Sequence, residues 1–169
     1  MRRFLNAIYD SAAALAALFM VGMLSMVLLS IASRQLHFHV SGTDAYAGYL
    51  MAGASFLALA HTLKRGEHIR VTLVLSAFKG TGRRALELWS LAAASLLASL
   101  FAYYSCRLVW QSLEFQDIST GNDATPLWIP QLAMALGTLI FALALTDELV
   151  LEIRGKRVSL ESGEMLRNE

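Results

Sequence analysis

The stretch from residue 63 to residue 80, LKRGEHIRVTLVLSAFKG, holds the side chains best suited to chemistry. Five of them fall within seven residues: Lys64, Arg65, Glu67, His68 and Arg70. A carboxylate beside an imidazole suggests an acid–base pair or a metal site. Glu67 and His68 are adjacent, however, so on a helix they point about 100° apart and cannot act on one ligand. The chain also has no HExxH, GxSxG or glycine-rich phosphate motif, so we expect no enzymatic activity.

The histidines and the single cysteine predict no cofactor. Axial haem ligation needs imidazoles at matching depth on facing helices. His61 is near the end of an apolar run, His68 lies beyond it, and His37 and His39 lie outside any run. A weak external metal site at His37 and His39 would need further ligands. Cys106 is alone and cannot form an intramolecular disulfide.

The elements that would position these residues are membrane helices. Of the 169 residues, 56% are hydrophobic and 16% are charged, which is a membrane composition. Four uncharged runs of 23, 19, 19 and 23 residues each reach across a bilayer as a helix. We therefore predict an all-α membrane protein with a single domain over residues 1–169 and a flexible tail over residues 155–169. The four predicted transmembrane helices cover residues 11–33, 45–63, 86–106 and 127–146.

Lysine and arginine counts predict the orientation in the membrane. The two connections on one side carry only Arg34 and Arg107, whereas the termini and the middle loop hold the other twelve basic residues. Basic residues accumulate in cytoplasmic connections. Both termini are therefore predicted to be cytoplasmic.

Two similar pentapeptides precede the second and fourth apolar runs. They are SGTDA at residues 41–45 and TGNDA at residues 120–124. Asp44 and Asp123 stand where a helix N-cap would accept hydrogen bonds from free backbone amides. Capping explains the repeat, and duplication of a two-helix hairpin is the alternative. Pro126 and Pro130 are predicted in the first turns of the last helix, where a missing amide donor costs little.

Small residues four apart are predicted to form packing faces, because they let helix backbones approach closely in lipid. The pairs are Gly48 and Ala52, Ala54 and Ala58, Ala94 and Ala98, Ser95 and Ser99, and Ala133 and Gly137. None of the four runs has a charge in its interior or a glycine or proline break at midspan. Transport sites usually show such features. We therefore expect that this chain does not hold a transport site.

The middle loop predicts an amphipathic helix over residues 67–79. At 100° per residue its polar side chains gather in one wedge, and apolar residues fill a wide arc. Such a helix suits the membrane interface or a protein partner. Glu67 and Arg70 project into the apolar arc, three residues apart. They either pair with each other or contact a partner.

The middle loop also resembles a known family. Arg65, Gly66, His68, Ile69 and Val71, in the order R-G-x-H-I-x-V directly after the second of four runs, are similar to the hallmark of one membrane subunit. This is the small, DctQ-like subunit of tripartite ATP-independent periplasmic (TRAP) transporters. The segment TPLWIPQLAMALG at the start of the last run fits the family as well. Thr72 departs from it, because an acidic residue is common there.

The resemblance implies an accessory role. In that family the small subunit binds a larger multi-span membrane subunit that carries the sodium and substrate sites, and a periplasmic binding protein delivers organic acids such as carboxylates. The chain would then be a scaffold that braces the large subunit and contacts membrane lipids but no nucleic acid. The implied partner-interface residues are Arg65, Gly66, Glu67, His68, Ile69, Arg70 and Val71. The alternative is a self-sufficient four-helix membrane protein, either a small channel or a haem-binding electron carrier.

Overall fold

Helices make up the regular structure of the described residues. The computed structural model describes residues 2–38, 40–64 and 81–155, and within these ranges the only β-type pairing is one isolated bridge between Ile118 and Pro126. The four helices are α1 (Arg2–Gln35), α2 (Thr43–Lys64), α4 (Thr81–Glu114) and α5 (Trp128–Ile153). The prediction of an all-α protein is confirmed for this part of the chain.

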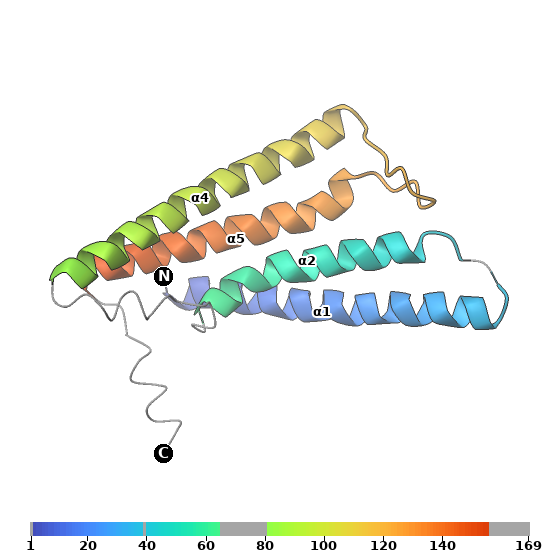
Figure 1. The fold of residues 1–169 in the computed structure, drawn as a ribbon, viewed down its shortest axis with the longest axis horizontal. Coiled ribbons are helices and arrows are strands. Elements are labelled where there is room, and N and C mark those ends of the chain that lie inside the picture. The colour runs from blue at the N-terminus through green and yellow to red at the C-terminus, as the bar shows by residue number, and fades with distance from the viewer. Residues whose placement is uncertain (1, 39, 65–80, 156–169) are drawn as a thin grey trace, which may run out of the picture.

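The helices form two antiparallel hairpins that lie side by side in one layer (Figure 1). Helix α1 packs on α2, α2 packs on α5, and α5 packs on α4. Helix α1 reaches α5 only marginally, and within the described ranges α1 and α4 are not in contact. The N-terminus, the end of α2, the start of α4 and the end of α5 lie at the same end of the layer (Figure 1). The layer is therefore one helix thick, with α2 and α5 at its centre.

Small side chains bring the helices together. Ala98 and Ala102 of α4 pack against Ala142 and Leu145 of α5 in one buried cluster. In the second cluster, Tyr9 of α1, Ala60 of α2 and Ala144 of α5 meet near the end that holds the N-terminus. Lipid offers no hydrophobic drive between helices, so close van der Waals contact must hold them.

Gly137 marks the closest approach of α2 and α5. A Cβ added there would lie 2.8 Å from the Phe56 Cβ and would also meet the Phe56 backbone. The predicted packing faces at Ala94 and Ala98 and at Ala133 and Gly137 are confirmed, because Gly137 and Ala98 are buried against a neighbouring helix.

The predicted packing face at Gly48 and Ala52 is wrong. A Cβ added to Gly48 would meet nothing within 4 Å, and Ala52 is exposed. These two residues lie on an open side of α2, so four-residue spacing alone did not identify its packing side.

Three of the four helices are long and apolar enough to cross a membrane. They contain the segments Leu5–Gln35, Arg84–Glu114 and Trp128–Ile153. Helix α2 is not among them, since its 22 residues include two glycines, two tyrosines and a histidine. The predicted count of four transmembrane helices is therefore not confirmed by hydropathy.

The helices extend beyond the predicted apolar segments. Helix α1 begins at Arg2 rather than residue 11, α4 ends at Glu114 rather than residue 106, and α5 ends at Ile153 rather than residue 146. Uncharged runs delimit the hydrocarbon-facing part of a helix, whereas backbone hydrogen bonds continue through polar residues beyond it. The predicted helix over residues 67–79 and the tail after residue 155 lie outside the described residues.

The predicted N-caps are wrong. The N-cap of α5 is Leu127, which makes no side-chain capping bond, and Asp123 lies four residues before it. Asp44 lies inside the first turn of α2, whose first backbone bond runs from the Tyr46 amide to the Gly42 carbonyl. Both carboxylates instead bond to side chains far away in the sequence, which local spacing could not reveal.

Candidate functional site

The residues predicted for the partner interface lie just beyond a described end of the chain. Arg65, Gly66, Glu67, His68, Ile69, Arg70 and Val71 all fall outside the described residues. The last described residue before them is Lys64, at the end of α2. The geometry of the candidate site therefore starts from Lys64.

Lys64 joins α2 to α5 through ion pairs with two carboxylates. We name this group, together with a neighbouring tyrosine, the Lys64 cluster: Lys64, Asp147, Glu148 and Tyr9. The Lys64 Nζ lies 2.5 Å from Asp147 Oδ2 and 3.2 Å from Glu148 Oε1. The three side chains are mostly buried, with exposed fractions of 22%, 26% and 15% in that order. The Nζ also lies 5.2 Å from the centroid of the Tyr9 ring, within range of a cation–π interaction.

The surroundings of Lys64 favour its charged form. Burial lowers the pKa of the ammonium, but the hydrogen bond to Asp147 and the charge and hydrogen bond of Glu148 outweigh burial and leave the pKa raised. Lys64 is therefore charged at neutral pH. Near the same end, His61 Nδ1 lies 3.8 Å from Asp10 Oδ1, which adds a contact between α2 and α1.

A second polar group, the Asp123 network, ties the hairpins together at the opposite end. It consists of Asp123, Ser119, Thr125, Tyr49 and Tyr46. The Tyr49 hydroxyl of α2 donates to Asp123 Oδ2 at 3.0 Å, and Ser119 Oγ donates to Oδ1 at 2.9 Å. Hydrogen bonds from Thr125, Ser119 and Tyr49 lower the pKa of Asp123 from 3.8 to about 2. The carboxylate is therefore charged at any physiological pH.

The two similar pentapeptides meet at this end. Gly42 has φ +81°, and a Cβ there would lie 2.9 Å from the Asp123 Cβ. A side chain at residue 42 would therefore be strained in its backbone and would push the two loops apart. The two similar pentapeptides therefore mark the point where the α1–α2 loop contacts the α4–α5 loop.

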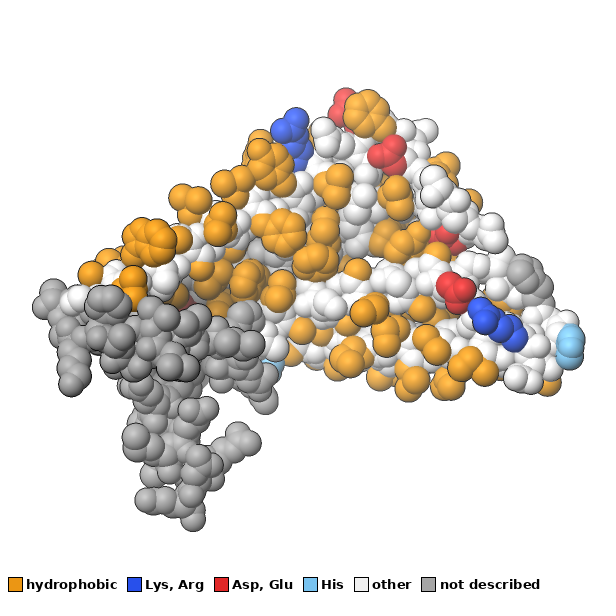
Figure 2. Space-filling model, viewed as in Figure 1, with side chains coloured by type: hydrophobic (Ala, Val, Ile, Leu, Met, Phe, Trp, Pro, Cys, Tyr) orange, Lys and Arg blue, Asp and Glu red, His pale blue; other side chains and the backbone are white. Residues whose placement is uncertain are grey.

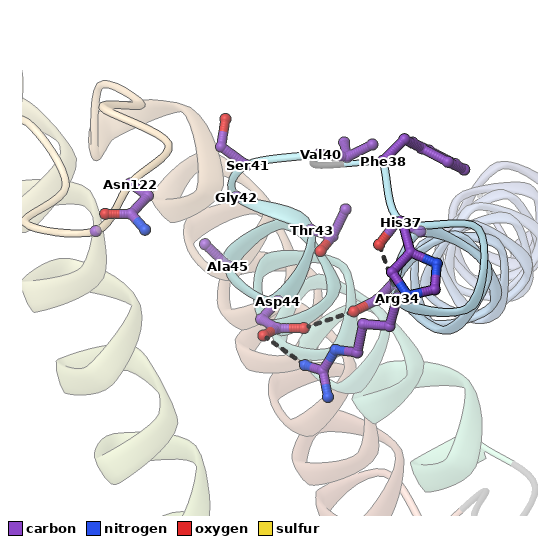
Figure 3. Close-up of a pocket in the computed structure, with 13 residues that line it drawn as sticks. Arg34, His37, Phe38, Val40, Ser41, Gly42, Thr43, Asp44, Ala45 and Asn122 are labelled. Carbon is purple, nitrogen blue, oxygen red and sulfur yellow. Dashed lines mark hydrogen bonds and ion pairs between the residues drawn. The ribbon is translucent and has the colours of Figure 1, made fainter.

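A shallow groove of about 600 Å³ lies beside this contact (Figure 3). The end of α1, the start of α2 and Asn122 line it. Arg34 lies 3.8 Å from Asp44, and Ser30 Oγ donates to Asp44 Oδ1 at 3.2 Å. The Arg34 and Asp44 side chains are exposed by 76% and 80%, so water screens their attraction.

These arrangements connect helices to one another and to the loops between them. Among the described residues, no group of three or more His, Cys, Asp or Glu side chains could hold a metal ion. Cys106 is a free thiol. Of the two histidines proposed as an external metal site, His39 lies outside the described residues.

Comparison with protein families decides the identity. The family model described as "Tripartite ATP-independent periplasmic transporters, DctQ component" matches residues 23–155. The match runs from within α1 to the residue after Arg154 and includes the middle loop. The chain belongs to the DctQ family.

Membership makes this DctQ chain the small membrane subunit of a TRAP transporter. DctQ components act with a larger membrane component and a substrate-binding protein, and they are transporter parts that are generally not enzymes. The sequence-based recognition of the family is confirmed. No curated protein matches this DctQ chain closely enough to report.

Sequence reasoning missed both polar groups of this DctQ subunit. In the sequence, Lys64 stands at the start of the basic middle stretch and Asp147 directly follows the last uncharged run, and neither position by itself predicts an ion pair. The available signal for this ion pair was that Lys64 and Asp147 have opposite charges and end two apolar runs on the same predicted side of the membrane. For Tyr49 and Asp123, which are 74 residues apart, the sequence offered no comparable signal.

Proposed function

We propose that the chain is a rigid brace for the large TRAP subunit and does not itself hold a substrate site. One observation carries this proposal: the two hairpins are tied to each other at three levels. The Lys64 cluster ties one end, the Gly137 contact the middle, and the Asp123 network the other end. A layer fixed at three levels resists sliding between its hairpins, which suits a static support for a moving partner.

The thinness of the layer argues against transport through this chain. Helices that line a path must surround it, but here each described helix packs on neighbours in a row. The uncharged runs keep Asp, Glu, Lys and Arg at the ends of the helices. Intramembrane charges usually mark ion and substrate pathways.

The proposed topology has four membrane crossings and cytoplasmic termini. Helix α2 lies between α1 and α5, both of which include segments apolar enough to cross. A central helix meets less lipid than its neighbours, so its glycines, tyrosines and histidine are less costly there. The proposed location is the inner membrane of a bacterium, with the basic middle loop in the cytoplasm.

The open face of α5 is the surface we assign to the large subunit. Its exposed apolar side chains recur at spacings of three and four residues: Ile129, Leu132, Leu136, Leu139 and Leu143. This spacing forms one continuous stripe on a helix and is the pattern that fits a facing helix. Figure 2 shows hydrophobic side chains across the visible face of the layer.

The middle-loop motif is proposed as a second contact with the large subunit. Arg65, Gly66, Glu67, His68, Ile69, Arg70 and Val71 follow directly after Lys64. The ion pairs of Lys64 fix the point from which this segment leaves α2. A partner contact beginning at a fixed point costs less entropy than one made by a free loop.

The proposed transport is sodium-driven uptake of organic acids such as carboxylates, as the family resemblance implies. Deleting this gene alone, with the large subunit and the binding protein retained, tests the role. We expect uptake of the transported acid to be lost and to return when the full chain is supplied on a plasmid. Uptake that persists at the wild-type rate in the deletion strain would refute the brace.

A further inference from the structure

Arg107 is an isolated charge on the C-terminal half of α4. The other basic residues of this helix, Arg83 and Arg84, lie in its first turn, more than twenty residues away. Arg107 is exposed and has no hydrogen-bond or ion-pair partner within the described part of the chain. In Figure 2, basic side-chain atoms lie among hydrophobic ones over this half of the helix. An unpaired charge at the edge of an apolar surface needs a counter-ion.

A groove of about 440 Å³ lies beside Arg107. Tyr104, Ser105 and Gln111 of α4 contribute polar atoms, and Met134 of α5 closes the other side. Phe101 and Leu108 add apolar surface to the same groove. Helices α4 and α5 diverge at this end of the layer (Figure 1). The groove therefore combines a cationic edge with mainly apolar walls.

Ser105 provides a second, independent sign of a ligand. Its side chain is 2% exposed, and its Oγ has no hydrogen-bond partner. Elsewhere on α4, Ser90 and Ser99 donate to backbone carbonyls three or four residues earlier, which is how hydroxyls in membrane helices are usually satisfied. A buried hydroxyl without a partner is destabilising, so it indicates a missing hydrogen-bond partner.

Aromatic residues place the groove at the membrane surface. Tyr103, Tyr104 and Trp110 are exposed by 63%, 54% and 71% and lie on both sides of Arg107 in the sequence. Exposed tyrosine and tryptophan prefer the level of the lipid headgroups. Arg107 therefore lies where lipid phosphates are found, with the apolar groove available to an acyl chain.

We propose that this groove binds one phospholipid, with its phosphate on Arg107 and an acyl chain along Phe101, Leu108 and Met134. The planar guanidinium can bond two phosphate oxygens at once. Ser105, whose hydroxyl has no hydrogen-bond partner, also lines this groove. A free phosphate ion would use the charge but leave the apolar walls bare, so the shape favours a lipid over an inorganic anion.

Native mass spectrometry of the purified, delipidated full chain tests the site. Phosphatidylglycerol, a diacylglycerol with the same chains, and inorganic phosphate are the probes. We expect phosphatidylglycerol to bind at least about fivefold more than the diacylglycerol, and R107Q to lower its binding about fivefold. The matched control is R34Q. Arg34 is a basic residue at the same end of the layer, but it is paired with Asp44. The R34Q protein should bind phosphatidylglycerol as the wild type does.

Several results would overturn the lipid site. One is phosphatidylglycerol binding by R107Q equal to that of the wild type, and another is equal binding of the diacylglycerol. Displacement of the lipid by millimolar inorganic phosphate would make it a free-phosphate site. If R107Q instead releases a copurifying protein while lipid binding stays constant, Arg107 pairs with a protein carboxylate. Should R107Q misfold, S105A provides a milder change, with about twofold weaker lipid binding expected and unchanged binding contradicting the proposal.

Discussion

The Lys64 ammonium lies 2.5 Å from the Asp147 carboxylate, joining two helices across 83 positions of sequence. Removing this ammonium would leave the mostly buried Asp147 carboxylate without its cation and would take one partner away from Glu148. We predict that Lys64→Gln lowers the free energy of unfolding by about 1–3 kcal/mol. Thermal unfolding in detergent measures the change. Arg34→Gln removes a highly exposed ion pair instead, and it should cost less than about 1 kcal/mol. Equal losses from the two variants would contradict the structural role of the Lys64 cluster.

Gly137 sets the distance between the central helices. Gly137→Ala places a methyl group against the Phe56 backbone, which cannot move aside as a side chain can. We expect the variant to lose about 1–3 kcal/mol of stability. Gly48→Ala is the matched control, since a Cβ there meets nothing within 4 Å. The control should be neutral or gain up to about 1 kcal/mol from helix propensity. A Gly137→Ala protein as stable as Gly48→Ala would mean that the helices do not pack this closely.

Asp123 predicts a loss of stability in acid. Its pKa is lowered to about 2 in the folded protein and is 3.8 ordinarily, so the folded state favours the charged carboxylate. The resulting stabilisation is complete above about pH 4 and disappears as the pH falls through about 2. Melting curves should be recorded between pH 6 and pH 2. At pH 6 the wild type should have a higher melting temperature than Asp123→Asn, and the two melting temperatures should converge towards pH 2. Asp117→Asn, an exposed residue of the same loop, is the control and should follow the wild type. A constant gap between wild type and Asp123→Asn would contradict the assignment.

The stripe on α5 predicts which face meets the large subunit. Leu136→Ala combined with Leu139→Ala removes two exposed side chains from the centre of the stripe. We expect the amount of large subunit that copurifies to fall severalfold, because each truncation removes buried contact area. Leu24→Ala with Leu28→Ala makes the same change on exposed positions of α1 and should have little effect. The assignment fails if the α1 pair causes the greater loss.

The middle-loop motif gives a separate test of the second contact. Glu67→Ala or Arg70→Ala should weaken association with the large subunit more than Lys79→Ala, because the helix predicted over residues 67–79 would place the first two in its apolar arc and the third in its polar wedge. Copurification yield under identical detergent washing measures the difference. Equal yields from all three variants would indicate that this segment contacts only lipid.

The sequence predicted the helices well, because uncharged runs report directly on a lipid environment. It also predicted the packing roles of Ala98 and Gly137, since small residues are the means by which membrane helices approach. The sequence could not distinguish Gly48, which packs against nothing, from Ala98 and Gly137, which do pack. Four-residue spacing shows that small residues share one helix face, but it does not show whether a neighbouring helix covers that face.

The polar contacts were much harder to predict. Asp123 matched the local pattern of an N-cap, yet its partner Tyr49 lies on α2, 74 residues away in the sequence. Lys64 and Asp147 are likewise distant in sequence and meet only because α2 and α5 pack together. Local rules describe a residue's own helix, whereas these bonds depend on how the two hairpins are arranged.

The claim that this chain braces a larger subunit is tested most directly by identifying the proteins that copurify with it from its native membrane. The tagged full chain is purified in a mild detergent, and the mass of the complex and the identity of its components are measured. We predict a complex in fixed ratio with a multi-span TRAP subunit. A chain that emerges alone, or only with copies of itself, would contradict the account.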